Sequence, residues 1–258
     1  MALKSEAMPL IDYFDLTLNT PLNIYSNLEK KIFLIISGIG VDNAIKATKK
    51  LYKIEFCKDD LWVNIGIAGH KTHEIGAIYE VKKVITNEGK EAYFTNSFYN
   101  NLPTATLCCV NSEEKYFNKE CLYDMESIGY LKTLDKLTIK ENIFIFKIVS
   151  DNSYQKLKNY KIFAISNIKK NIIKINNILN IYRVKSADKK TDINFIINLI
   201  KKKYHVTFYN EKKIEKILIK ILTFKDKEKI EREIFNSESL NDIIKKLEDN
   251  LSKYILKI

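Results

Sequence analysis

The chain has 258 residues, of which 46% are apolar and 29% are charged, a composition that suits one large globular domain, alone or with a small appendage. This composition excludes collagen-like, disulfide-stapled and disordered chains. The sequence contains no run of about 18 uncharged apolar residues and does not begin with a basic-then-apolar segment. We therefore expect neither a membrane span nor a secretory signal, and we place the protein in the cytoplasm.

The four cysteines are Cys57, Cys108, Cys109 and Cys121. They lack C-x-x-C spacing, and two of them are adjacent, which suits neither a zinc ribbon nor a disulfide framework. We therefore predict reduced, mostly buried thiols.

The net charge of +11 is distributed unevenly along the chain. Residues 1–150 hold 18 Lys/Arg and 19 Asp/Glu, a net charge of −1, whereas residues 151–258 hold 25 and 13, a net charge of +12. Such asymmetry can mark nucleic-acid binding. However, only Arg183 and Arg232 are arginines, and lysine is a poor substitute in bidentate recognition of bases and phosphates. The sequence therefore favours a solvated basic surface over a nucleic-acid partner.

The first segments of the chain show one helix, then a strand, a turn and a second helix. Apolar residues recur at helical spacing over residues 3–15. The apolar run at 31–36 predicts a buried strand, and the Ser-Gly-Ile-Gly segment at 37–40 predicts a tight turn. Helical spacing returns between Val41 and Tyr52.

The strand pattern recurs further along the chain. Residues 61–65 form an apolar run that enters a glycine-rich segment, 66–69, which we interpret as a turn, and another strand is expected over 75–85. Residues 143–149 form a buried strand that ends at 150–152, before a long helical pattern. Strands that alternate with helices in this way indicate an α/β fold with helices on both faces of the sheet.

Strand patterns become rare after about residue 183. Lysine-rich amphipathic patterns predict helices over 192–203, 211–224 and 239–256. We therefore expect a main α/β domain over 1–182 and a basic, mainly helical C-terminal extension over 183–258. A cap on the main domain is favoured over a partner-binding module, because lysine-rich faces usually meet water.

Common cofactor motifs are incomplete or missing in the sequence. Gly38 and Gly40 follow a predicted strand, but Asn43 replaces the third glycine of a dinucleotide-binding G-x-G-x-x-G motif. The G-x-x-x-x-G-K-[ST] motif of nucleotide-phosphate sites does not occur. His70 and His73 lack a nearby third ligand, so we interpret them as polar loop residues and expect no metal.

Three polar segments, 37–40, 66–69 and 150–152, follow predicted strands. The carboxyl ends of strands are where open α/β sheets bind their ligands. A carboxylate pair, Asp124 and Glu126, lies between the last two segments. By themselves, Asp124 and Glu126 would be a helix N-cap and a first-turn acid. Together with the three polar segments, however, they indicate a binding site more specifically than any one of these features does.

Five segments, in this order along the chain, resemble the nucleoside phosphorylase/nucleosidase superfamily, and within it most closely the methylthioadenosine/S-adenosylhomocysteine nucleosidases. The segments are Ala2–Ala7, Ser37–Gly40 with Asn43–Ala44, Asn64–Gly69 with Ile75–Gly76, Asp124–Glu126 and Ser150–Asp151. The resemblance implies a three-layer αβα sandwich around a central mixed sheet, followed by the C-terminal helical extension. It also implies hydrolysis of the N-glycosidic bond of a purine nucleoside or 5′-thio-nucleoside, with release of the base.

The resemblance assigns roles to the catalytic residues. Asp151 matches the aspartate that protonates the purine at N7, and Ser150 matches the serine that orients it. Glu6 matches the glutamate that positions and deprotonates the attacking water, and Ser37 lies beside that water site. A proton donor of this kind needs a raised pKa, which burial at a strand end could supply.

The resemblance also assigns the substrate-binding residues. Glu126 matches the glutamate that binds the ribose hydroxyls, where its negative charge would favour an oxocarbenium-like transition state. Met125 matches the residue under the sugar, and Gly66 belongs to the glycine-rich segment of the same site. The resemblance implies a small-molecule nucleoside as ligand, a homodimer, and neither a metal nor an organic cofactor.

Three features depart from the family pattern. No buried strand precedes Ala2–Ala7, and the stretch Leu107–Asn111 lacks the phenylalanine that usually stacks on the purine. Asn152 follows the Ser-Asp pair in a segment where a second carboxylate is usual. We therefore expect differences at the start of the sheet and in the base subsite.

The basic residues bear on the choice of nucleophile. Phosphorylases of this superfamily hold phosphate with arginines, and residues 1–182 contain none, so water is favoured. Two alternatives stay open: a phosphate-dependent nucleoside phosphorylase, and a catalytically weakened nucleoside-binding sensor with a basic interaction tail.

Overall fold

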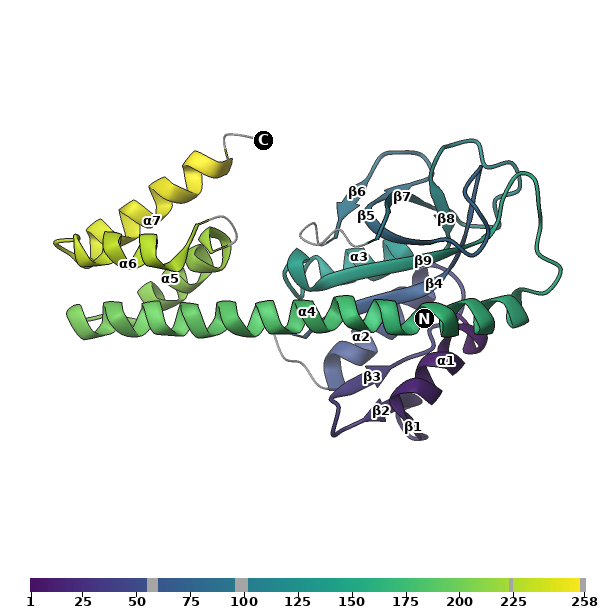
Figure 1. The fold of residues 1–258 in the computed structure, drawn as a ribbon, viewed down its shortest axis with the longest axis horizontal. Helices are drawn as coiled ribbons and strands as arrows, with labels where there is room; N and C mark the ends of the chain where they lie inside the picture. Colours follow the sequence, from purple (N-terminus) through teal and green to yellow (C-terminus); the bar gives the residue numbers. More distant parts are fainter. Residues whose placement is uncertain (55–59, 96–101, 223–224, 256–258) are drawn as a thin grey trace. The chain divides into compact units, whose positions relative to one another are not determined.

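The computed structural model describes residues 1–54, 60–95, 102–222 and 225–255 (Figure 1). Its contacts divide the chain into two compact units, Met1–Leu179 and Asn180–Ile258. Within the described ranges, no helix combines the length and the hydrophobicity that crossing a membrane requires.

The described part of the first unit contains a six-stranded mixed sheet. In spatial order the strands are β6 (Ala92–Phe94), β5 (Ile78–Thr86), β7 (Thr104–Cys109), β8 (Leu122–Asp124), β4 (Trp62–His70) and β9 (Ile143–Asp151). The β4–β9, β5–β7 and β7–β8 pairs are parallel, whereas β4–β8 and β5–β6 are antiparallel. Because β5 also pairs with β9 through Ile78–Glu80, five of the strands form a closed circuit.

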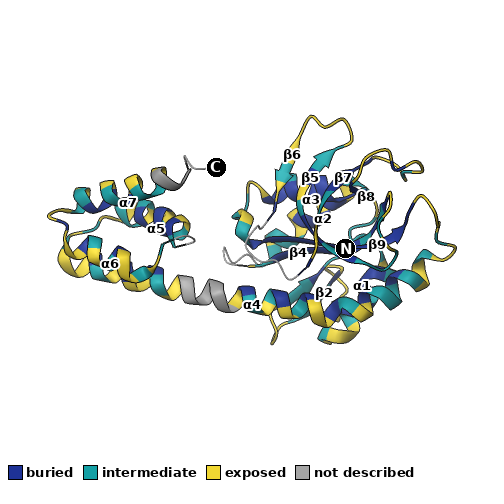
Figure 2. Cartoon of the chain, turned by 45° about the horizontal axis from the view of Figure 1, so that its top comes forward, coloured by how far each residue is buried: buried dark blue, intermediate teal, exposed yellow. Residues whose placement is uncertain are grey.

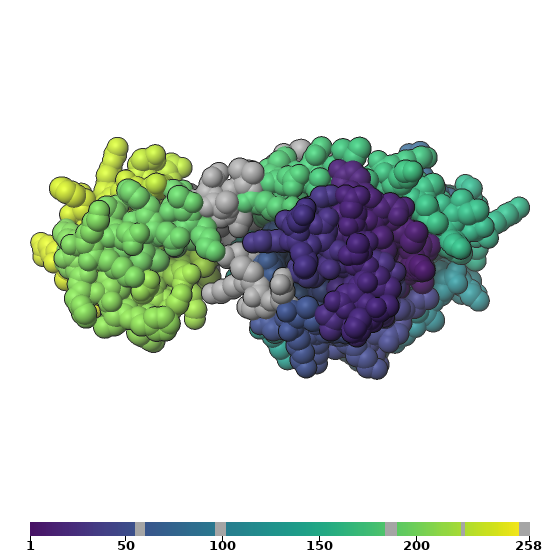
Figure 3. All heavy atoms as spheres, turned by 90° about the horizontal axis from the view of Figure 1, so that it is seen from below, coloured from purple at the N-terminus to yellow at the C-terminus, as the bar shows by residue number. Residues whose placement is uncertain are grey.

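Helices cover both faces of this sheet, as predicted. Every residue of β9 is buried (Figure 2), which requires cover on both sides of the strand. Helices α2 (Val41–Ile54) and α3 (Ser127–Leu134) pack with one set of strand side chains into a common core. Helix α1 (Lys4–Phe14) lies beside the beginning of α4 (Tyr160–Lys203), where Asn176 Nδ2 is 3.5 Å from the Tyr13 hydroxyl (Figure 3). The predicted α/β class with a mixed central sheet is therefore confirmed.

A small antiparallel sheet follows α1. It consists of β1 (Thr17–Asn19), β2 (Ile24–Asn27) and β3 (Ile32–Leu34). The backbone N–H groups of Ser37 and Gly38 donate to the carbonyls of Met1 and Ala2 at 2.8 and 3.1 Å. The residues ahead of α1 therefore run beside the loop that leads into α2.

The prediction of a turn at Gly66–Gly69 is wrong, because this segment lies inside β4. Its glycines serve close packing. A Cβ atom on Gly66 would lie 2.8 Å from Glu6 Oε1, and one on Gly69 would lie 2.5 Å from Cε1 of Phe117. Glycine in a strand often marks such close approach.

The second unit is a helical bundle with its own apolar core. Besides the end of α4 it contains α5 (Phe208–Ile221), α6 (Lys227–Phe235) and α7 (Leu240–Ile255). Isoleucines and leucines of all four helices form its buried cluster. Two predicted helices correspond to α5 and α7, whereas the helix expected over 192–203 is the end of α4, and α6 was not predicted.

Three of the four cysteines lie among the described residues, and all three are buried free thiols, as predicted. Cys108 and Cys109 end β7, and Cys121 immediately precedes the neighbouring strand β8. Cys57 lies outside the described residues.

Candidate active site

Glu6 is held between the first turn of α1 and strand β4. Its side chain is 3% exposed. The backbone N–H of Leu3 donates to Oε2 at 2.9 Å, and that of Ile67 donates to Oε1 at 3.0 Å. Two backbone N–H groups, one at the start of α1 and one in β4, therefore hold the Glu6 carboxylate between the helix and the sheet.

Glu126 is held in a similar way between β8 and α3. Its Oε1 accepts a hydrogen bond from the Gly40 N–H at 2.9 Å, and its Oε2 accepts one from the Met125 N–H at 3.3 Å. Burial raises the pKa of Glu126, the neighbouring Asp124 carboxylate adds to this increase, and Lys147 opposes it. The loop at 37–40 and the segment after β8 thus meet at one carboxylate.

Lys147 is the cationic side chain of this cluster, and the sequence patterns did not predict its role. Its Nζ lies 2.8 Å from Asp124 Oδ2 and 3.1 Å from Asn64 Oδ1, and the residue is 3% exposed. Burial lowers the pKa of Lys147, but the carboxylates of Asp124, Glu126 and Glu6 raise it above its usual value. A single lysine inside the apolar run of β9 was the available signal, because a charged residue is rarely buried without a partner.

Gly66 brings the Glu6 and Lys147 side chains together. The position of a Cβ atom on Gly66 is 2.8 Å from Glu6 Oε1 and 3.3 Å from Lys147 Nζ. The carboxylate and the ammonium group therefore approach the same point of β4, and any larger residue would displace them.

The cluster has an excess of negative charge. It contains the carboxylates of Glu6, Asp124 and Glu126, the ammonium group of Lys147, and the N-terminal amino group of Met1, whose pKa burial lowers. In a site of low dielectric constant, such an excess stabilises a positive charge and repels an anion.

Asp151 lies further along β9. Its side chain is 7% exposed, and the Ser150 hydroxyl donates to Oδ1 at 2.5 Å. Burial raises the pKa of Asp151, and the hydrogen bond from Ser150 opposes this rise. Asp151 lies four positions beyond Lys147 along the strand, which places their Cα atoms roughly 13 Å apart. The structure therefore brings Glu6 and Glu126 together around Lys147, and places Asp151 at a second position on the same strand.

An aromatic ring covers the Asp151 side of the site. The point at which Gly69 would carry a Cβ atom is 2.5 Å from Phe117 Cε1 and 3.5 Å from Asp151 Oδ1, and Phe117 is 1% exposed. The backbone of Phe117 has φ of 48°, a left-handed conformation that is rare for a bulky residue. The family pattern places an aromatic residue at Leu107–Asn111, whereas Phe117 lies in the loop between β7 and β8.

Several solved structures of methylthioadenosine nucleosidases share this fold. A 5′-methylthioadenosine nucleosidase from Arabidopsis thaliana aligns with a TM-score of 0.56 and 21% identity, over 69% of this chain and 93% of its own. MTAN from Chlamydia trachomatis bound to MTA aligns with a TM-score of 0.57 and 21% identity, over 68% and 94%. The 5′-methylthioadenosine/S-adenosylhomocysteine nucleosidase from Helicobacter pylori has a TM-score of 0.57 and 14% identity, over 69% and 95%. This chain has the nucleosidase fold.

The superfamily resemblance read from the sequence is thereby confirmed at the level of the fold. No protein-family model matches the chain, and no curated protein matches its sequence. The nucleosidase structures cover about the same fraction of the chain as the first unit, Met1–Leu179, makes up.

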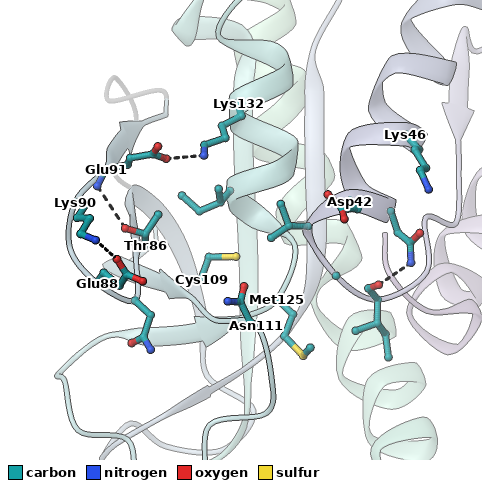
Figure 4. A pocket seen from close by; sticks show the side chains of 16 residues that line it. Asp42, Lys46, Thr86, Glu88, Lys90, Glu91, Cys109, Asn111, Met125 and Lys132 are labelled. Atoms are coloured by element: carbon teal, nitrogen blue, oxygen red, sulfur yellow. Dashed lines mark hydrogen bonds and ion pairs between the residues drawn. The ribbon is translucent and has the colours of Figure 1, made fainter.

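A cavity of about 760 Å³ lies near the carboxylate cluster, and Figure 4 shows the residues that line it. Gly40 and Met125, whose N–H groups bind Glu126, both line it. Glu6, Glu126 and Asp151 are not among its lining residues. The carboxylates therefore lie behind the wall of this cavity.

Ser37 and His70 make local contacts. The Ser37 hydroxyl is 2.8 Å from the Gly38 carbonyl and 3.2 Å from the Met1 carbonyl, so it is engaged by backbone. His70 Nδ1 accepts the N–H groups of Thr72 and His73, each at 3.0 Å, which occupies that nitrogen. Burial, with the adjacent His73, lowers the pKa of His70 to about 4. No cluster of metal-ligating side chains occurs among the described residues.

Proposed function

We propose that the chain hydrolyses the N-glycosidic bond of a purine nucleoside or 5′-thio-nucleoside and releases the base. The observation that carries this proposal is the buried cluster in which Glu6 and Glu126 surround Lys147, with Asp151 further along the same strand. The fold shared with nucleosidases supports it, although fold alone does not establish chemistry.

Asp151 is proposed as the general acid. Departure of the purine leaves negative charge on the base, and a carboxylic acid that retains its proton can neutralise this charge at N7. The raised pKa of Asp151 favours the protonated form, and Ser150 fixes the orientation of the carboxyl group. Phe117 would offer the base an aromatic surface beside this acid.

Glu126 and Glu6 are proposed to act on the sugar side. Glu126 would accept hydrogen bonds from the ribose hydroxyls, and Glu6 would orient the attacking water and take its proton. Lys147 limits the repulsion between these carboxylates, while the remaining negative excess stabilises the oxocarbenium-like transition state.

The charge of the cluster also favours water over phosphate. A phosphate dianion at Glu6 would face three buried carboxylates and one lysine, and Coulomb repulsion in a buried site is strong. A phosphorylase on the same fold is the second candidate, because Lys147 is a buried cation in a region without arginine.

A nucleoside panel tests the proposal. Adenosine, inosine and their 5′-methylthio derivatives are incubated with the protein, with and without phosphate, and the products are separated by liquid chromatography. We expect free base and free sugar without phosphate. Release of base only with phosphate would establish the phosphorylase, and tight binding without release of base would indicate a sensor.

The Asp151→Asn variant tests the assignment of the acid. It removes the proton at nearly constant volume, so turnover should fall by about 10²-fold or more, while circular dichroism and binding of the nucleoside are retained. Unchanged turnover would rule out Asp151 as the acid.

The homodimer and the cytoplasmic location stay predictions. Size-exclusion chromatography with light scattering would test the first, and cell fractionation would test the second.

A further inference from the structure

Two thiols of the first unit lie in one small apolar cluster. Cys108 is near the end of β7, opposite Tyr123 in the parallel pairing of β7 with β8, and Cys121 precedes Tyr123 by two positions. Side chains two positions apart along a strand share one face of the sheet, so both thiols lie on the face that carries Tyr123. Phe117, from the loop between the two cysteines, packs in the same cluster.

The two thiols are in direct contact. The Cys121 thiol donates a hydrogen bond to the Cys108 sulfur, and this bond has the largest effect on the pKa of each group. It lowers the pKa of Cys108, with burial opposing and the charge of Lys119 assisting, and it raises the pKa of Cys121. Cys108 is therefore the thiol that ionises more readily, and the thiolate is the nucleophilic form.

A small molecule in the cavity of Figure 4 would lie close to this pair. Cys108 is fully buried and Cys121 is 3% exposed. However, Cys108 Sγ lies 3.8 Å from Oδ1 of Asn87, and Asn87 lines the cavity. A single side chain therefore separates the Cys108 sulfur from the cavity, and only a small oxidant fits this route.

The neighbouring cysteine has different surroundings. Cys109 follows Cys108 in β7, so its side chain points to the opposite face of the sheet. It packs in the core that α2 and α3 cover, and burial raises the pKa of its thiol. Cys108 and Cys121 thus form a pair from which Cys109 is excluded.

We propose that Cys108 and Cys121 form a reversible disulfide when the protein meets a hydroperoxide. The Cys108 thiolate attacks the peroxide: an S–O bond forms, the O–O bond breaks, and water or an alcohol leaves with the proton that Cys108 had released. The Cys121 sulfur then attacks the Cys108 sulfur: the S–S bond forms, the S–O bond breaks, and the hydroxyl group leaves as water with the Cys121 proton. The two thiols supply the two electrons that reduce the peroxide, and a dithiol reductant reverses the reaction.

The disulfide would act on the loop that carries Phe117. The sulfur atoms of a disulfide are about 2.05 Å apart, closer than two hydrogen-bonded thiols, so the ends of this loop must move together. The Phe117 ring packs against Gly69 beside Asp151, and a displacement of about 1 Å at a site can lower turnover by about 10²-fold. We expect turnover to fall about tenfold or more in the oxidised protein. This consequence, unlike the disulfide itself, rests on the proposed function.

Peptide mapping tests the disulfide. The full chain is treated with hydrogen peroxide, free thiols are blocked with N-ethylmaleimide, and the protein is digested with trypsin without reductant. Cleavage after Lys115 and Lys119 separates Cys108 from Cys121, so we expect one linked peptide pair that dithiothreitol separates. Blocked thiols at both positions, or a linked pair that contains Cys57 in place of Cys121, would overturn the proposal.

Serine variants identify the two sulfur atoms. Cys109→Ser is the matched control, because Cys109 is in the same tryptic peptide as Cys108, and it should retain the linked pair. Cys108→Ser should abolish the pair. In Cys121→Ser the reaction should stop at the sulfenic acid of Cys108, which dimedone labels. A linked pair that persists in Cys108→Ser, or that is lost in Cys109→Ser, would contradict the assignment.

Turnover separates the disulfide from its consequence. Base release by the wild type should fall with peroxide and return with dithiothreitol, whereas Cys121→Ser should not show the reversible loss. Unchanged turnover in a protein that contains the disulfide would overturn the effect on the site and leave the disulfide in place. Absence of base release in both redox states would refute the proposed hydrolysis, and peptide mapping would still decide whether the disulfide forms.

Discussion

The interiors of the two units differ in how much charge they contain. Among the described residues of the first unit, the interior includes Glu6, Asp124, Glu126, Lys147 and Asp151. In the described part of the second unit, the buried cluster is made of isoleucines and leucines, and the only buried polar residue is Ser237.

The buried charges make the first unit the candidate site of chemistry, whereas the apolar interior of the second unit contributes to stability. Burial of an ionised group costs several kcal/mol unless a partner compensates it. The first unit bears this cost at several positions within one small region, as sites of catalysis commonly do. The second unit bears almost none, so its interior is explained by packing alone. We therefore expect substitutions in the first unit to alter turnover, and those in the second to alter only the stability of that unit.

The largest effect is expected from Lys147→Met. This change leaves three buried carboxylates without their cation, and removal of one partner of a buried ion pair typically costs about 3–5 kcal/mol. Urea unfolding, followed by the fluorescence of Trp62, measures the change, since Trp62 is the single tryptophan and lies in β4. Lys132→Met is the matched control, because its partly exposed pair with Glu91 should contribute less than about 1 kcal/mol. Equal stabilities of the two variants would contradict the role of Lys147.

Leu218→Ala is the corresponding test of the second unit. Leu218 is fully buried in α5, and truncation of a buried leucine costs about 2–5 kcal/mol. The helical circular dichroism signal should then be lost at a lower urea concentration, while the Trp62 fluorescence transition and the turnover stay as in the wild type. A parallel shift of both signals would show that the two units unfold together.

The sequence predicted the elements whose periodicity is clear, and it failed where a contact between distant residues decides the structure. The helices at α1 and α2 and the strand at β9 were predicted, because their apolar spacing is intact. Gly66–Gly69 was interpreted as a turn, since glycine favours turns in sequence and the approach of Glu6 and Phe117 is visible only in three dimensions.

The candidate site shows the same limit. Glu126 and Asp151 lie in polar segments that stand out beside the predicted strands, but their roles, and the choice of Glu6, depend on short motifs that resemble a family. Lys147 lay within the same strand pattern but was missed, because its partners Asp124 and Asn64 are distant in sequence. The Phe117 ring was missed because its loop has no periodicity and its position depends on a left-handed backbone.

Gly66→Ala should have an intermediate effect in the first unit. The added methyl group would lie 2.8 Å from Glu6 Oε1, so the carboxylate must leave the Ile67 N–H. We expect a loss of about 1–3 kcal/mol in stability, as for other overpacked positions, and a loss of turnover similar to that of Glu6→Ala. Full turnover in a folded Gly66→Ala protein would show that the position of Glu6 is not critical.

The smallest effect is expected from the titration of Asp151. Burial raises the pKa of Asp151 in the folded state, so the folded protein holds this proton more tightly than the unfolded chain, where an Asp has its ordinary pKa of about 3.9. The contribution of Asp151 to stability is therefore fully present below that pH and is lost as the pH rises through the folded pKa. Asp151→Asn cannot titrate, so its stability relative to the wild type should increase between pH 4 and pH 7. Urea midpoints at several pH values measure this difference, and Ser150→Ala should enlarge it, because the Ser150 hydrogen bond holds the pKa down. A difference that is constant across the pH range would show that Asp151 titrates as it does in the unfolded chain, and the first unit would then lack the protonated acid that distinguishes it from the second.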